Sequence, residues 1–322
     1  MNTPPVTIGL VGDVMLGRLT NEAILARGPD YPWGNMLEQL RTLDGLIINL
    51  ETTITIHTQA TPKVFNFKAD PRIISTLQNA HVTVANLANN HSLDFGPEGL
   101  AETLSILHNV GIKTTGAGAT LRAAQQLATF EREGVTIGVI GCTDNEPTWA
   151  ASANKPGIFF IDNTNINMLT KQIAAARNNV DILIVSYHWG PNWDNNPSAE
   201  IQKRAHEIID SGADLIHGHS PHIVQGIEQY KQGFIIYGAG DFVDDYAVDP
   251  IRRNDYGALY QLAIRNKTIE SITVFPTQIS SMQANKADAT ATATILQSIA
   301  TKSAQLNTHV TRQNDTLIIN RQ

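Results

Sequence analysis

The chain has 322 residues, of which 42% are hydrophobic and 16% charged, and its formal net charge is −7. This composition is typical of a soluble globular protein. The acidic balance and the lack of a dense Lys/Arg run argue against nucleic acid or an anionic membrane as a partner. A single cysteine, Cys142, excludes an internal disulfide framework. No signal peptide is visible and no apolar run approaches the ~20 residues that span a bilayer, so we expect a cytoplasmic protein without a membrane segment.

The first part of the chain alternates short apolar runs with helical patterns. The apolar runs predict buried strands at residues 6–11, 43–50, 82–87 and 112–115. The segments between and after them predict helices at residues 19–27, 33–41, 71–79, 97–110 and 120–126. This alternation is typical of an α/β fold in which helices cover a sheet.

The later part continues the alternation and then changes character. Strands are predicted at 135–142, 182–187 and 234–237, with a looser segment at 143–163 and helices at 165–177 and 198–210. Beyond Tyr256 we expect two strands joined at Asn266-Lys267, a helix at 286–305 and a terminal hairpin turning at Asn314-Asp315. No linker is evident. We therefore predict a single domain over 1–322, with 257–322 as a C-terminal strand-helix-hairpin extension of it.

Three histidines follow the apolar run that begins after Asp214. His217, His219 and His222 fall within six positions, although the whole chain contains only 10 histidines. Neutral imidazole is the commonest protein ligand of transition metals, and the end of a strand holds it rigidly. The pattern therefore predicts a metal site. For His217, a hydrogen bond at the strand end is as good an interpretation as a catalytic role.

Other predicted strands also end in polar side chains. These side chains are Asp13, Glu51, Asn90 with His91, and His188. Because sites in open α/β sheets gather beyond the carboxyl ends of the strands, we expect them to converge with the histidine cluster. Carboxylates, an amide and imidazoles together suit Mn, Fe or Zn. Their number exceeds what one tetrahedral zinc needs, so the sequence predicts two divalent metal ions.

Six short motifs, taken together in chain order, resemble one known family. They are GDVMLGR at 12–18, NLE at 49–51, ANNHSLDFG at 88–96, HWG at 188–190, GHSPH at 218–222 and YGAGDF at 237–242. The set resembles the calcineurin-like metallophosphoesterase superfamily and, more closely, its poly-γ-glutamate capsule biosynthesis (CapA-type) branch. The resemblance implies a sandwich of two mixed β-sheets flanked by helices in α-β-β-α layers. It also implies metal-dependent hydrolysis of a phosphoester or related glutamyl amide bond, linked to poly-γ-glutamate metabolism.

The resemblance implies a role for each matched residue. The implied metal ligands are Asp13 and His222 on a first ion, Glu51 between the two ions, and Asn90, His188 and His219 on a second. His91 matches the histidine that protonates the leaving group or steadies the transferring oxygen, and Asp94 is its implied orienting partner.

Three positions depart from the pattern of the superfamily. Met15 stands where a histidine is usual, and a thioether is a poor ligand for hard divalent ions, so the first metal would lose a ligand. Glu51 replaces the more general aspartate, which is typical of this branch. Asp241 stands where the branch commonly shows asparagine, and its added negative charge would support a cation or bind a substrate amine.

The candidate substrate-binding residues are Arg18, Lys68, Trp189 and Asp241. Arg18 and Lys68 are the basic side chains that would hold an anionic substrate, although a lone basic residue is more often a solvated surface group. Trp189 and the nearby Trp193 flank a polar loop, and they either line a peptide-like or sugar-like ligand or belong to the core. We therefore expect a small-molecule or peptide-like anionic substrate.

Two other functions remain open beside the metal-dependent hydrolase. One is a metal-independent acid/base enzyme, such as an epimerase acting on a peptide residue, with His91, His219 or Asp13 as bases. The missing histidine at position 15 favours it. The other is a non-catalytic module that binds an acidic polymer or a partner protein.

Overall fold

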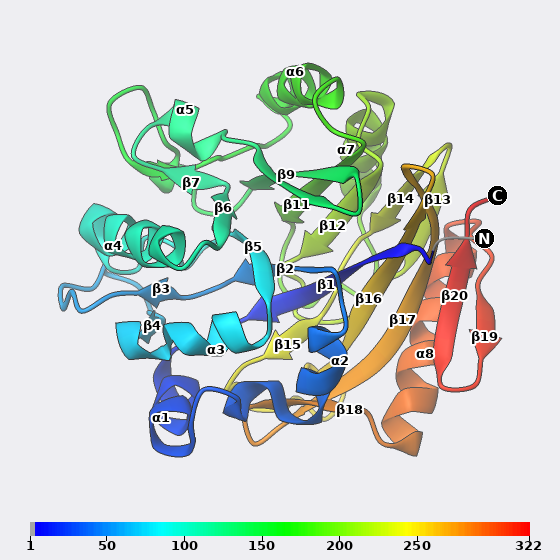
Figure 1. The fold of residues 1–322 in the computed structure, drawn as a ribbon, viewed down its shortest axis with the longest axis horizontal. Helices are drawn as coiled ribbons and strands as arrows, with labels where there is room; N and C mark the ends of the chain where they lie inside the picture. The colour runs from blue at the N-terminus through cyan, green and yellow to red at the C-terminus, as the bar shows by residue number, and fades with distance from the viewer. Residues whose placement is uncertain (1–3) are drawn as a thin grey trace.

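Two large β-sheets form the centre of the molecule, and the computed structural model describes residues 4–322 of it (Figure 1). The 10-stranded sheet has the main order β19 (Thr311–Gln313), β20 (Thr316–Asn320), β17 (Thr268–Ser280), β16 (Tyr256–Arg265), β1 (Val6–Val14), β2 (Gly45–Leu50), β5 (Val82–Asn86), β6 (Lys113–Thr115). Two more strands join this sheet, β15 (Asp241–Val243) beside β1 and β18 (Gln283–Lys286) beside β17.

The second sheet and two small strand pairs complete the β-structure. The 6-stranded sheet has the order β13 (Ile227–Tyr230), β14 (Gly233–Ile236), β12 (Leu215–His219), β11 (Ile182–His188), β9 (Val135–Thr143), β8 (Ala128–Arg132). The small pairs are β10 (Gly157–Ile158) with β7 (Ala117–Gly118), and β3 (Thr53–Ile54) with β4 (Lys68–Ala69).

Helices cover the outer faces of both large sheets. The larger sheet packs against α1 (Arg18–Arg27), α2 (Leu37–Arg41), α3 (Ile74–Asn79) and α4 (Gly96–Asn109). The smaller sheet packs against α6 (Ile166–Arg177) and α7 (Ala199–Asp210). Helix α8 (Ala289–Gln305) contributes to the core between the sheets. The remaining short elements are α5 (Leu121–Ala124) and the 3₁₀ turns η1 (Tyr31–Met36), η2 (Pro71–Ile73) and η3 (Pro147–Trp149).

Strand β1 shows why the sheets form the middle of the molecule. Its side chains face two apolar environments on opposite sides of the sheet, although irregular pairing between Leu10 and Val14 interrupts the strict alternation of a strand. Ile8 and Leu10 lie in the cluster between the sheets, together with Val139 from β9. Val11 and Val14 lie in the cluster beneath the helices. The predicted α-β-β-α layering of two mixed sheets is therefore confirmed.

The parallel strands bring polar residues to one edge of each sheet. In the larger sheet Asp13 is in register with Asn49 on β2 and with Asp241 on β15. In the smaller sheet His188 on β11 is in register with His219 on β12. Because these strands are parallel, their carboxyl ends lie at the same edge, which is where sites form in α/β folds.

The structure also differs locally from the sequence-based expectations. His217 and His219 belong to strand β12 itself, so only His222 of the cluster lies in the loop beyond it. The expected helix at 33–41 is shorter in the structure: η1 is kinked at Gly34, whose φ is 47°, and only Leu37–Arg41 forms the α-helix α2. Strands β8 and β13 were not predicted. Within the described residues, none of the helices combines the length and apolar character that a bilayer crossing requires.

Candidate metal centre

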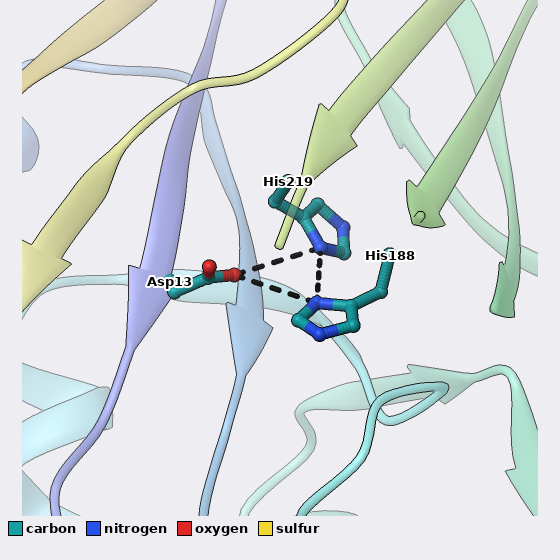
Figure 2. A group of neighbouring side chains, drawn as sticks. All are labelled: Asp13, His188 and His219. Carbon is teal, nitrogen blue, oxygen red and sulfur yellow. Dashed lines mark hydrogen bonds and ion pairs between the residues drawn. The ribbon is translucent and has the colours of Figure 1, made fainter. Parts of the chain in front are cut away.

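Asp13, which belongs to the 10-stranded sheet, faces two histidines of the 6-stranded sheet. Its Oδ1 lies 3.7 Å from Nδ1 of His188 and 3.6 Å from Nδ1 of His219. Figure 2 shows the three side chains pointing toward one another. The two Nδ1 atoms are themselves 3.0 Å apart. The three side chains come from β1, β11 and β12, so each is mounted on a buried strand. Two imidazole nitrogens and a carboxylate oxygen converging in this way form a candidate site for a transition metal.

The other carboxylate oxygen of Asp13 faces a second group. Its Oδ2 lies 3.6 Å from Nδ1 of His222, and Glu51 completes this group. In each of the two groups, one potential ligand atom per residue lies within 4.8 Å of the others. Asp13 is shared between the groups, whereas Glu51 belongs to one of them. The structure thus brings together Asp13, Glu51, His188, His219 and His222, which the sequence places far apart.

Buried oxygens without partners show that this centre suits a cation. Both side-chain oxygens of Glu51 and the Oδ1 of Asn90 are buried and accept no hydrogen bond within the described part of the chain. Burial, together with the charge of Asp13, raises the pKa of Glu51 well above its usual value. Removing a carboxylate from water without a partner is costly. A divalent cation would offset that cost, so the donor set fits the predicted metal.

The pKa values of the other members of the centre follow from burial and proximity. Burial alone would raise the pKa of Asp13, but its interactions with the surrounding histidines hold that pKa below its usual range. Burial lowers the pKa of His219 well below its usual value. Asp13 is therefore ionised and His219 neutral near pH 7. These are the protonation states that metal binding requires.

A layer of amides orients the carboxylate of Asp13. Asn49 donates from Nδ2 to Oδ1 of Asp13 at 2.7 Å. The side-chain Oδ1 of Asn49 accepts in turn from Nδ2 of Asn86 at 3.2 Å and from Nδ2 of Asn89 at 3.1 Å. Partners of this kind hold metal ligands in place and tune them. These three amides were not among the predicted site residues, although Asn49 and Asn89 lie inside the matched motifs.

His91 and Asp94 form a second unit beside the metal centre. His91 Nδ1 lies 2.6 Å from Asp94 Oδ2, and the opposite nitrogen, Nε2, lies 3.7 Å from Glu51 Oε1. Phe67 stacks on the imidazole with ring centroids 3.7 Å apart. Lys63 Nζ lies 3.0 Å from Asp94 Oδ1. Burial lowers the pKa of His91 to about 4. The ring is therefore neutral at pH 7, with its position held on three sides.

Asp241 lies against His222 and next to a second carboxyl group. Its Oδ1 is 2.8 Å from His222 Nδ1, which orients that imidazole. Its Oδ2 and the Oδ2 of Asp244 are buried without hydrogen-bond partners in the described residues. Burial and neighbouring negative charge raise the pKa of both carboxyls well above the usual range. Asp241 thus contacts a candidate metal ligand, while the predicted role in binding a substrate amine stays a prediction.

Other predicted residues lie outside the metal centre. Lys68 donates to the carbonyl of His57 at 3.2 Å, and Trp189 is buried, donating from its indole to the carbonyl of Tyr237 at 2.8 Å. His217 is buried beside Ser186, and burial lowers its pKa to about 4.

Met15 occupies a position in the core. It is fully buried, and its sulfur accepts from the backbone N–H of Gly17 at 3.1 Å. This placement accounts for an apolar side chain at a position where the superfamily usually has a ligand.

A cavity of about 780 Å³ opens over the centre. Its lining residues are Arg18, Lys63, Val64, Phe65, Phe67, Asn90, His91, Asn192, Trp193, His222, Tyr246 and Ala247. Three of them, Asn90, His91 and His222, are predicted metal-binding or catalytic residues, so the cavity leads to the candidate metal centre. Of the predicted substrate-binding residues, Arg18 lines this cavity, whereas Lys68 and Trp189 are absent from its lining.

The layered fold and the site at the strand ends define the class of protein. The fold is similar to that of a hypothetical protein from Thermus thermophilus, with a TM-score of 0.53, 13% identity, and coverage of 85% of this chain and 100% of that chain. It is also similar to a novel phosphatase from Mycoplasma pneumoniae, with a TM-score of 0.50, 12% identity, and coverage of 89% and 92%. These similarities establish the fold, which this chain shares with a phosphatase.

Sequence relatives identify the family within that class. The family model described as bacterial capsule synthesis protein PGA_cap matches residues 7–246. Capsule biosynthesis protein CapA of Bacillus anthracis is 31% identical over 283 residues, covering 85% of this chain and 67% of that protein. A probable polyglutamine synthesis accessory protein of Mycobacterium tuberculosis is 31% identical over 365 residues, covering 98% and 96%. The chain belongs to the PGA_cap family, and the resemblance to its CapA-type members is confirmed.

Proposed function

We propose that this protein is a hydrolase that uses two divalent cations to cleave a phosphoester or related glutamyl amide bond in capsule or polyglutamate metabolism. The observation that carries the proposal is the position of Asp13, which turns one oxygen toward His219 and the other toward His222. A carboxylate shared by two ligand groups suits a pair of ions. The names of the relatives, which refer to capsule, PGA and polyglutamine synthesis, support the metabolic context.

The proposed ligands are Asp13, Glu51, Asn90, His188, His219 and His222. Cations held by these residues would supply Lewis acidity, which would offset negative charge on the oxygens of the reacting phosphoryl group and lower the pKa of water. The chain's own part is to hold these ligands on rigid strands and to keep the donor atoms buried. Asn49 contributes by fixing the carboxylate of Asp13 through its amide.

His91 is the proposed proton carrier. Its Nδ1–H donates to Asp94, which leaves the lone pair of Nε2 directed toward Glu51 and the cavity. Since the ring is neutral at pH 7, Nε2 can accept a proton from the attacking water and return it to the oxygen or nitrogen of the leaving group. The ring of Phe67 and the Asp94–Lys63 ion pair keep the imidazole in that orientation.

The decisive experiment combines metal analysis with activity in the same preparation. Protein purified without added ions is analysed for Mn, Fe and Zn, and is then assayed with each metal on phosphate monoesters, phosphodiesters and γ-glutamyl peptides. We expect close to two ions per chain and hydrolysis of at least one class. The Asp13→Asn variant should lose bound metal and at least about 100-fold of the activity. Asp210→Asn, at an exposed acid, is the matched control.

The possible failures separate the competing functions. Turnover that survives complete removal of metal would support the acid/base enzyme and contradict the hydrolase. Stable metal binding without turnover on any class would instead support a non-catalytic binding module. Normal metal content in Asp13→Asn would contradict the shared role that the proposal gives to this carboxylate.

A further inference from the structure

Aromatic side chains form the walls of the cavity over the metal centre. These side chains are Phe65, Phe67, Trp193 and Tyr246. They stand next to the residues proposed to do chemistry, because Phe67 stacks on His91 and the rings of Trp193 and Tyr246 lie 5.3 Å and 5.7 Å from that of His222. A ligand held at the centre would therefore extend its remaining atoms between aromatic rings. The volume of about 780 Å³ is within the range of pockets for small molecules.

The two cationic side chains of the cavity are already paired. Arg18 donates to both carboxylate oxygens of Asp245, whose side chain is only 1% exposed. The same guanidinium lies 5.2 Å from the ring centroid of Phe67 and 5.7 Å from those of Phe65 and Tyr246. It is thus held among three rings and a buried anion. This arrangement suits a structural support of the aromatic walls better than a free group that receives a substrate anion.

Lys63 is partnered in the same way. Its ammonium group pairs with the buried carboxylate of Asp94 at 3.0 Å and donates to the backbone carbonyl of Asn90. Among the described lining residues, neither Lys63 nor Arg18 offers an uncompensated positive charge. A chain of carboxylates extending through the cavity would find no unpaired cation there, and it would have to give up its hydration against aromatic rings.

The rim of the cavity exposes large apolar side chains to water. Val64 is 89% exposed and its neighbour Phe65 is 59% exposed. Val248, which follows the lining residue Ala247, is 51% exposed. Scattered exposed apolar residues are ordinary, but a group of them at the mouth of a pocket marks a surface that a ligand covers.

We infer that this cavity binds a planar apolar group, such as an aryl ring, carried by the substrate next to the bond that is cleaved. The substrate is then a small phosphoester with its negative charge at the reacting group and an uncharged planar remainder, and not a polycarboxylate chain. Of the two bonds named in the proposed function, this inference selects the phosphoester over the glutamyl amide. The inference rests on the proposed function only for the position of the reacting group at the metal centre. Recognition of the planar group depends on the aromatic walls alone.

The test measures binding with and without the reacting group. Isothermal titration calorimetry on the Mn-loaded full chain compares phenylphosphonate, methylphosphonate and 2-carboxyethylphosphonate. Phenylphosphonate should bind at least about tenfold more tightly than either of the others, because stacking adds to the burial of the ring. In parallel, saturation-transfer NMR measures the binding of p-cresol, which lacks a phosphoryl group, to protein from which EDTA has removed the metal. We expect p-cresol to bind.

The variants locate the ring within the cavity. Phe65→Ala removes a side chain that is mostly exposed, so the fold should tolerate it. Alone or with Trp193→Ala it should reduce both the preference for phenylphosphonate and the p-cresol signal. Tyr230→Leu is the control, since it removes an aromatic ring of β13 that does not line the cavity.

Each outcome decides one question. If 2-carboxyethylphosphonate binds as tightly as phenylphosphonate, or if p-cresol does not bind, the inference is overturned. The inference is also overturned if Phe65→Ala with Trp193→Ala leaves the preference intact. If p-cresol binds in this cavity but no phosphonate does, the aromatic site stands and the proposed phosphoesterase function fails, so the two are distinguished.

Discussion

At the scale of single residues, removal from water decides the protonation states in the metal centre. His91 lies against Asp94 and yet has its pKa lowered to about 4, because burial opposes the positive charge more strongly than the carboxylate favours it. The pKa of Glu51 shifts in the opposite direction for the same reason: burial disfavours the negative charge of the carboxylate and raises its pKa. The first effect keeps the imidazole neutral at pH 7, and the second leaves a carboxyl group whose ionised form a cation would stabilise.

His91→Gln should separate chemistry from metal binding. Because His91 belongs to neither ligand group, the variant should keep its metal while losing about 10²- to 10⁴-fold in kcat, the usual contribution of a positioned acid or base. The measurement pairs elemental analysis with steady-state kinetics on the best substrate. His108→Gln, at an exposed histidine of α4, is the matched control. A parallel loss of metal and activity in His91→Gln would show that His91 acts as a ligand.

At the scale of elements, the site depends on how closely strands approach each other. The backbone at Gly12 and Asp13 on β1 packs directly against the backbone at Gly240, the residue before Asp241. The backbone N–H of Asp13 donates to the carbonyl oxygen of Gly240 at 3.1 Å. A Cβ on Gly12 would meet that carbonyl oxygen at 1.7 Å. Gly12 is therefore required for close approach, which places two of the acids of the site side by side.

Gly12→Ala should push β1 away from the segment that carries Asp241. We expect a loss of about 3 kcal/mol or more in the free energy of unfolding, since an overpacked backbone contact cannot relax by a rotamer change. Metal affinity should fall with it. Gly134→Ala is the control: its Cβ would meet nothing within 4 Å, and its φ of 74° alone should cost about 1 kcal/mol. Urea unfolding measures both, and equal losses would contradict the close-approach argument.

Helix α8 carries a lysine whose charge is partly desolvated. Lys302 donates to the carbonyl of Val224 at 2.7 Å, and burial lowers its pKa to about 8 from the ordinary 10.5. At pH values between these two pKa values, Lys302 binds more protons in the unfolded chain than in the folded one. The contribution of Lys302 to stability should therefore increase as the pH rises from 8 to 10.5.

Lys302→Met should remove this pH dependence. The difference in unfolding free energy between wild type and Lys302→Met is measured in urea at pH 7, 8, 9 and 10, and it should shift in favour of the wild type above pH 8. Lys171→Met, at an exposed position of α6, should show no such shift. A constant difference over this range would mean that Lys302 keeps an ordinary pKa in the folded protein.

At the scale of the whole molecule, the candidate metal centre lies where the two large sheets meet. Asp13 belongs to the 10-stranded sheet, whereas His188 and His219 belong to the 6-stranded sheet (Figure 2). The apolar core holds the two sheets together along their facing sides. The ligand groups also draw residues from both sheets, at the edge where the sheets meet. Cations that bind only this arrangement would stabilise the pairing of the sheets as well as the local site.

Metal binding should raise the temperature of a single unfolding transition. At a free Mn concentration of 100 times Kd the expected gain is about 2.7 kcal/mol, which corresponds to roughly 4 °C for a chain of this size. Differential scanning calorimetry with Mn and with EDTA measures it. A single transition that moves as a whole would agree with the predicted single domain over 1–322. Two transitions, one of which keeps the same midpoint temperature with Mn and with EDTA, would contradict the single domain.

Local patterns in the sequence were sufficient for the fold class and for the main ligand candidates. Apolar runs marked most of the buried strands, because a strand buried on both faces leaves a continuous hydrophobic segment. Asp13, Glu51 and His188 could be identified as candidates because each follows such an apolar run. The carboxyl ends of parallel strands lie at one edge of a sheet, where sites form. The motifs carrying these residues also indicated the family, which the family model and the relatives confirmed.

Only the packing of the two sheets decided which side chains meet. The pairing of Arg18 with Asp245 joins residues 227 positions apart, and no local pattern encodes such a contact. Trp189 and Trp193 are four positions apart in one segment, yet the first is buried and the second lines the cavity. Periodicity reports which side of an element faces the core, whereas a pocket is formed by surfaces of several elements. The composition of the cavity walls therefore follows from the tertiary structure alone.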